Sequence, residues 1–219
     1  MRKLKAVLSA VLVSAAVIGL GVHTFKSNAN EIVNNETDGD YENRFDMDVA
    51  EISNMLPVFT AIGARMDYEN CEYALTDEFV ANAMGYITYY GRDMLADKYT
   101  EDEENIYVEK DIFDQLAKTA FYKYDIESNK ALNYNADTDS YIIKKDELCK
   151  KYSAEIVSVV NIDGKKDGEF YNTYEVIAKI KKGLFTDVEM KFTLEDNEYV
   201  AVTDGYLFNY AVKDVEIIK

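Results

Sequence analysis

The stretch VEMKFTLE, residues 188–195, alternates strictly between apolar and polar side chains. Val188, Met190, Phe192 and Leu194 lie on one side of an extended chain, and the polar residues between them lie on the other. This pattern predicts a strand with one buried and one hydrated face, as in an antiparallel sheet that is covered on a single side. Further strands are expected over 154–162, 170–181, 199–202 and 206–217.

Upstream of these strands, apolar residues recur every three or four positions, which predicts helices. The first is expected over residues 44–68, where Pro57 either kinks it or opens a second segment. The second begins after Thr76, the expected N-cap, and stops at Gly91. A third is expected over 111–122.

Shorter elements are expected between these helices and the long strands. Residues 106–108 form an extended piece, residues 131–134 and 141–143 form the two arms of a hairpin, and residues 144–152 form a short helix. The helices are the available cover for the sheet.

The predicted fold class is therefore α+β, with helices packed on one face of a curved antiparallel sheet. A single domain is expected over residues 44–219, helical over 44–124 and β-rich over 125–219.

The N-terminus has the plan of a secretory signal peptide. Arg2, Lys3 and Lys5 precede an uncharged, mostly apolar run over 6–22, and small residues before position 30 favour cleavage after Ala29. Residues 30–43 are polar and acidic and are expected to be a flexible spacer. The alternative is an uncleaved anchor, in which case the segment holds the protein at a membrane. Either way the chain is predicted to act outside the cytoplasm, secreted or attached to the cell envelope.

The charge of the chain excludes one class of partner. It contains 24 basic and 41 acidic residues, a net charge of −17, so a nucleic acid is not an expected ligand. Cleavage after Ala29 removes four of the basic residues and His23, the only histidine. The mature chain then cannot use a Ser-His-Asp or Cys-His mechanism or a histidine-ligated zinc ion, and no cofactor is predicted.

Tyrosines suggest one candidate ligand site. Tyr86, Tyr89 and Tyr90 share one face of the second predicted helix, close to Arg92. A tyrosine offers a flat apolar ring with a polar tip, which suits the wall of a sugar or peptide groove. The alternative is that these rings seal the seam between helix and sheet.

Acidic residues suggest two further chemistries. Asn135, Asp137, Asp139 and Asp146 resemble part of a calcium loop, although Ser140 stands where that loop needs glycine. A solvated hairpin turn is the alternative. The run 101–104 could hold a cation but is typical of a solvated loop. Two facing carboxylates could also support glycoside hydrolysis without histidine.

Two cysteines, Cys71 and Cys149, remain after cleavage. In an oxidising compartment they are candidates for a disulfide, which would stabilise the fold by about 4–5 kcal/mol. The alternative is a pair of isolated thiols. A structural role is expected for both.

The hairpin around 134–143, the Asp146-Glu147-Leu148 segment and the tyrosine-rich closing strands give a layout that resembles exported proteins of Gram-positive bacteria with a signal peptide, a spacer and a small α+β domain. Over residues 70–219 the order of helices before strands is similar to the cystatin-like cone folds, including the nuclear-transport-factor type. The resemblance implies a fold and no site residue, because no functional motif of these families is matched.

Three functions follow as hypotheses. The first is a non-catalytic extracytoplasmic binding module that uses a groove between helices and sheet to hold a protein, peptide or glycan at the cell surface. The second is a histidine-free hydrolase with paired carboxylates. The third is a calcium-stabilised structural protein of the envelope. Two facing carboxylates with raised pKa values would favour the second.

Overall fold

The computed structural model describes residues 48–95, 98–122, 133–145, 148, 151–162, 173–183, 186–197 and 208–218. These residues form an α+β fold, so the predicted fold class is confirmed. The predicted signal peptide, the spacer and the strand over 199–202 lie outside the described residues.

The longer helices among the described residues are α2 (Leu56–Glu69), α3 (Asp77–Tyr90) and α4 (Lys110–Ala120). A short helical segment over 48–53 comes before α2, and Pro57 occupies the first turn of α2. Of the two roles considered for Pro57, opening a second segment is the one observed. The Thr76 hydroxyl accepts a hydrogen bond from the Phe79 amide at 3.3 Å, and Gly91 is the C-cap of α3, as predicted.

The long strands form one antiparallel sheet, which we call sheet B. It contains β5 (Tyr152–Asn161), β6 (Thr173–Lys182), β7 (Thr186–Asp196) and β8 (Tyr210–Ile217), in that order across the sheet. The VEMKFTLE stretch lies in β7, and its alternation is confirmed, because Met190, Phe192 and Leu194 are fully buried. The opposite face carries cross-strand ion pairs such as Lys191 with Glu216, at 2.8 Å.

A second antiparallel sheet, sheet A, corrects the expectation of a single sheet. Its order is β1 (Tyr99–Glu101), β2 (Asn105–Glu109), β4 (Ser140–Lys144) and β3 (Asn133–Asn135). The predicted hairpin is β3–β4, and the extended piece over 106–108 is the centre of β2. The helix predicted over 144–152 is wrong at both ends, since Lys144 closes β4 and Tyr152 opens β5.

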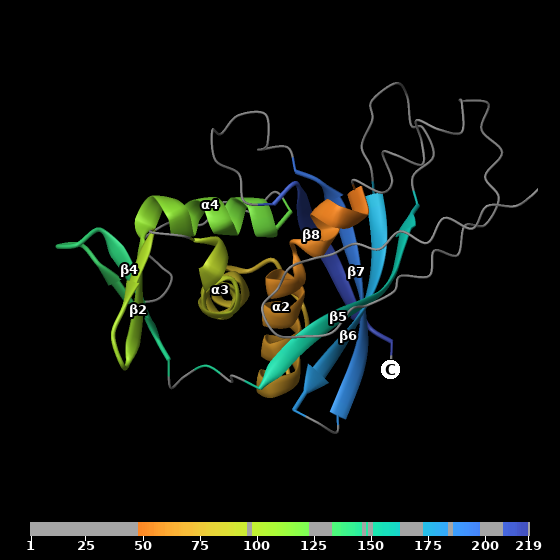
Figure 1. Cartoon of the computed structure of the whole chain (residues 1–219), viewed down its shortest axis with the longest axis horizontal. Coiled ribbons are helices and arrows are strands. Elements are labelled where there is room, and N and C mark those ends of the chain that lie inside the picture. The colour runs from red at the N-terminus through yellow and green to blue at the C-terminus, as the bar shows by residue number, and fades with distance from the viewer. Residues whose placement is uncertain are drawn as a thin grey trace, which may run out of the picture.

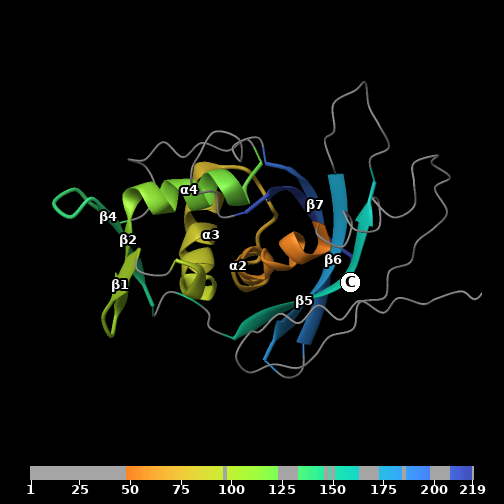
Figure 2. The same cartoon turned by 45° about the horizontal axis from the view of Figure 1, so that its top comes forward.

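The helices form a middle layer between the two sheets (Figure 1). Helix α2 packs on β5 and β6 of sheet B, whereas α4 contacts β2 and β4 of sheet A and also β8. The 3₁₀ turn η1 (Arg92–Met94) follows α3. The view of Figure 2 shows the same arrangement, with the sheets on opposite sides of the helices. The outer face of sheet A therefore points away from sheet B.

Aromatic contacts join the middle layer to each sheet. The rings of Phe59 in α2 and Phe192 in β7 lie 4.6 Å apart, and Phe113 in α4 stacks on Tyr141 in β4 at 4.1 Å. All four side chains are fully buried. Burial of large apolar side chains is the main source of stability in such contacts.

Candidate functional site

A shallow depression of about 310 Å³ lies on the outer face of sheet A. The cross-strand register places Thr100 beside Tyr107 and Glu109 beside Ser140, and paired residues of an antiparallel ladder share a face. Ile106 and Val108 lie on the opposite face and are buried. The lining residues are Lys98, Tyr99, Thr100, Tyr107, Glu109, Thr138 and Ser140; of these, Tyr99 pairs with Val108, so its side chain belongs to the opposite face.

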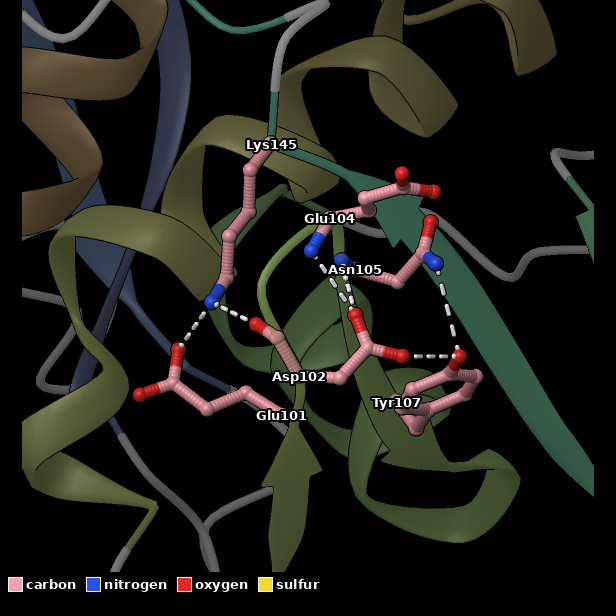
Figure 3. Close-up of polar contacts among 6 residues, drawn as sticks. All are labelled: Glu101, Asp102, Glu104, Asn105, Tyr107 and Lys145. Carbon is pink, nitrogen blue, oxygen red and sulfur yellow. Dashed lines mark hydrogen bonds and ion pairs between the residues drawn. The ribbon is translucent and has the colours of Figure 1, made fainter.

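The turn between β1 and β2 holds Tyr107 in place (Figure 3). One oxygen of the Asp102 carboxylate accepts hydrogen bonds from the amides of Glu104 and Asn105, at 2.8 and 2.7 Å. The other accepts the hydroxyl proton of Tyr107 at 2.7 Å. An aspartate that binds the amides two and three positions ahead stabilises a tight turn, and here the same carboxylate also orients a ring at the depression.

Lys145 ties the end of β4 to this turn (Figure 3). Its ammonium group lies 2.8 Å from the Glu101 carboxylate and donates to the carbonyl of Asp102. The Lys145 amide also donates to the Glu104 carbonyl, at 2.7 Å. In the acidic run 101–104, the carboxylates of Glu101 and Asp102 are therefore occupied by other groups of the protein.

The electrostatics of this turn keep its groups in their usual charge states at neutral pH. The hydrogen bond from Tyr107, with two backbone amides, lowers the pKa of Asp102, and Lys145 lowers the pKa of Glu101. The same bond to Asp102 raises the pKa of Tyr107. A general acid at neutral pH needs a carboxyl with a raised pKa, which neither Asp102 nor Glu101 has.

The four residues of the tyrosine hypothesis lie near one another but in different environments. Tyr86 is 2% exposed and belongs to the core. Tyr89 and Tyr90 are half-buried and in edge-to-face contact, and the Arg92 guanidinium lies 5.0 Å above the Tyr89 ring. The Tyr90 hydroxyl accepts a hydrogen bond from the Tyr152 amide, at the seam between α3 and sheet B. A ligand-binding role for this group stays a prediction.

The residues of the calcium hypothesis lie in the turn between β3 and β4. The side chain of Asn135 accepts a hydrogen bond from the Asp137 amide at 3.0 Å, and Asp139 accepts one from the Tyr134 hydroxyl at 2.6 Å. Asp139 has a left-handed backbone, with φ of 47°. Asp146 lies outside the described residues, and within them no group of three acidic, cysteine or histidine side chains could hold a metal ion.

Cys71 lies just after α2, with its sulfur 3.7 Å from the Arg65 carbonyl and unpaired within the part of the chain that the structure describes. Partial burial raises its pKa, which makes the thiol a weak nucleophile. Cys149 lies outside the described residues, so the disulfide between them stays a prediction.

Two aspartates that each bind tyrosine hydroxyls of sheet B were not predicted. Asp48 accepts hydrogen bonds from the hydroxyls of Tyr174 in β6 and Tyr210 in β8, the latter at 2.8 Å. Asp67, near the end of α2, binds the Tyr152 hydroxyl and, at 3.0 Å, the ammonium group of Lys182. These carboxylates fasten the helical layer to both ends of sheet B.

Replacing Asp67 with asparagine is expected to reduce the dependence of stability on acid pH. The hydrogen bond from Tyr152 and the charge of Lys182 lower the folded-state pKa of Asp67 despite its partial burial. The stabilisation is therefore present above the unfolded-state pKa of about 4 and is lost as pH falls through the folded-state value. Asp67→Asn should cost about 1.5 kcal/mol at pH 7 and remove this part of the acid loss.

Urea denaturation between pH 7 and pH 2 measures this effect. Asp187→Asn is the matched control, because Asp187 is exposed and lies 4.0 Å from Lys179, a distance that predicts almost no contribution. Equal acid sensitivity in Asp67→Asn and the wild type would show that the carboxylate does not stabilise the fold.

No known protein family, curated protein or solved structure matches the chain. The resemblance to exported proteins and cone folds accordingly stays a prediction. Among the helices that the structure describes, none combines the length and the apolar character needed to cross a membrane.

Proposed function

We propose that the protein is a non-catalytic extracytoplasmic binding module whose ligand site is the depression on the outer face of sheet A. The extracytoplasmic part of the proposal rests on the predicted signal peptide over residues 1–29. The observation that carries the binding part is the lining of the depression: apart from Tyr99, whose side chain belongs to the other face, each lining residue offers a hydroxyl, carboxylate or ammonium group. The sequence suggested a ligand site in a groove between helices and sheet, but Tyr86 of that site is buried. The site proposed here lies instead on the face of sheet A that points away from the helices.

The ligand that fits this lining best is a neutral glycan. The Thr100 hydroxyl offers a donor and an acceptor. The hydroxyls of Thr138 and the buried Ser140 bond to each other at 2.7 Å and as a pair still offer acceptors, and the half-buried ring of Tyr107 offers a flat surface. A peptide would be expected to find aliphatic pockets for its side chains, and the lining contains no purely aliphatic residue. The net charge of −17 disfavours anionic polymers.

The hydrolase alternative receives less support from the groups at the depression. Hydrolysis requires one carboxyl that is protonated at neutral pH and a second that is ionised. The lowered pKa of Asp102 and its bonds to Tyr107 and two amides favour a structural role. Binding without turnover is the function that we propose.

Replacing Tyr107 with alanine is expected to weaken glycan binding about fivefold, because a stacked aromatic ring contributes about 1 kcal/mol. Isothermal titration with a soluble oligomer of N-acetylglucosamine measures the affinity. Tyr68→Ala is the matched control, since Tyr68 is an exposed tyrosine in α2.

Wild type and Tyr68→Ala should bind equally, with Tyr107→Ala weaker and equally folded by circular dichroism. No binding by the wild type, or equal binding by all three proteins, would contradict the proposed site. If a short extended peptide binds and the glycan does not, the proposed ligand class is wrong and the ligand is a peptide.

A further inference from the structure

Among the strands that the structure describes, β5 forms one edge of sheet B, and the hydrogen bonds at its two ends define which backbone groups face outward. The Tyr152 amide donates to Tyr90 and so points away from β6; Ala154 and Ile156 then point the same way. A register shift follows between Ile156 and Ser158. The Ile162 amide donates to the Thr173 carbonyl at 2.9 Å. The backbone N–H and C=O of Val160 therefore point toward β6, and those of Val159 point outward.

The outer part of this edge is unusually apolar for so acidic a chain. Residues 156–162 read IVSVVNI and contain no charge, proline or glycine. Val157, Val160 and Ile162 are each 44% exposed. A run of β-branched residues with these properties is what natural edge strands usually avoid, because it pairs with other strands.

The opposite edge of sheet B, strand β8, carries charges and is contacted by other parts of the chain. Strand β8 carries Lys213, Asp214 and Glu216. Its Val212 carbonyl accepts hydrogen bonds from the Tyr73 hydroxyl and the Tyr122 amide, at 2.8 and 3.1 Å. Charges and covering contacts therefore protect β8, whereas the uncharged run lies on β5.

We propose that β5 pairs antiparallel with β5 of a second copy, across a two-fold axis at Val160. In this register Val160 faces Val160 of the other copy and Ser158 faces Ile162. The bulge at Val157 limits the pairing to the segment after it. The two sheets B then join into one continuous sheet.

The occupant is a second copy because the segment is complementary to itself. A two-fold pairing places the same short segment of both copies side by side, so a charge within it would lie close to the same charge of the other copy. Residues 156–162 carry none, in a chain whose net charge of −17 otherwise repels a second copy. The dimer leaves sheet A free, on the far side of the helices, so this proposal and the proposed function can fail separately (Figure 1).

Cysteine cross-linking tests the register directly. In the proposed pairing, Val160 of one copy and Val160 of the other form a non-hydrogen-bonded pair. The Cα atoms of such a pair lie about 4.5 Å apart, which allows a disulfide between cysteines placed there. Under mild oxidation of the exported protein, Val160→Cys should convert mostly to a covalent dimer on a non-reducing gel. The matched control is Ile217→Cys on β8, where the side chain is 56% exposed, with the wild type as the background from Cys71 and Cys149. Equal cross-linking of both variants would overturn the proposal.

Sedimentation velocity tests the association itself. The wild type should show a dimer fraction that rises with concentration, and Ile217→Lys should behave as the wild type. Val160→Lys should sediment as a monomer and should melt at the wild-type temperature when both are diluted to where the wild type is also monomeric. A wild type that stays monomeric at about 0.3 mM, or a folded Val160→Lys protein that stays dimeric, would contradict the pairing.

Discussion

Raising the pH from 10 to 11 is expected to remove about 2 kcal/mol of stability through Tyr174 and Tyr210 alone, and the protein should unfold by about pH 12. The side chains of these two tyrosines are 1% and 3% exposed. Burial, followed by the hydrogen bond to Asp48, raises the pKa of each phenol well above its usual value. Total stabilities of domains are typically only about 5–15 kcal/mol, so the loss is a large share.

The direction of this effect follows from proton binding. A raised folded-state pKa means that the native state keeps its phenol protons at a pH where the unfolded chain has released them. Stability is complete below the unfolded-state pKa of about 10 and decreases as pH rises toward the folded-state value. Burial also raises the pKa of Tyr152, to about 12, and adds to the loss.

Circular dichroism and tyrosinate absorbance, recorded together from pH 8 to pH 12.5, measure the effect. Tyr210→Phe is the informative variant: it should be less stable at pH 7, because Asp48 loses one hydrogen bond, and should lose less stability above pH 10. Ionisation of all tyrosines near pH 10 with native circular dichroism would contradict the burial of these phenols.

Replacing Gly63 with valine is expected to destabilise the fold by about 3 kcal/mol, at the upper end for an overpacked core. A Cβ atom added at Gly63 would lie 2.7, 2.8 and 2.9 Å from three side-chain carbons of Ile180. Two of these carbons are bonded to the Ile180 Cβ, so rotation of the tip cannot relieve the contact. Gly63 thus allows α2 to approach β6 closely.

Gly85→Ala in α3 is the matched control. An added Cβ there meets only ordinary contacts at 3.7 Å, with Ile143 and Leu148, so the helix propensity of alanine should stabilise the protein by about 1 kcal/mol. Urea denaturation gives both values. The steric account fails if Gly63→Val is as stable as the wild type, or if shortening Ile180 to alanine does not recover part of the loss.

Local patterns predicted the elements that bury one face. The alternation in β7 and the cap at Thr76 depend on residues close in sequence, and the structure confirms both. For Pro57 it shows one of the two roles considered, the start of a second segment. The second sheet was missed because its pairing is not local: Ile106 of β2 lies opposite Ile143 of β4. Strand β1 has only three residues and is followed by an acidic turn, so its alternation is too short to be recognised as a strand from the sequence.

The candidate site was predictable only in part. The sequence Asn105-Ile106-Tyr107-Val108-Glu109 alternates, and this pattern could have placed Tyr107 and Glu109 on an exposed face. The bond from Tyr107 to Asp102 could also have been expected from their closeness. Asp48 is separated from Tyr174 and Tyr210 by 126 and 162 positions in sequence, so no pattern of neighbouring residues predicts these hydrogen bonds.

The most direct test of the binding proposal is a titration of the isotope-labelled protein with the N-acetylglucosamine oligomer, followed by amide NMR. Shift changes should concentrate at Thr100, Tyr107, Glu109, Thr138 and Ser140, and the oligomer should be recovered intact after prolonged incubation. Shift changes elsewhere with this region unaffected would contradict the site, and cleavage of the oligomer would contradict a non-catalytic role.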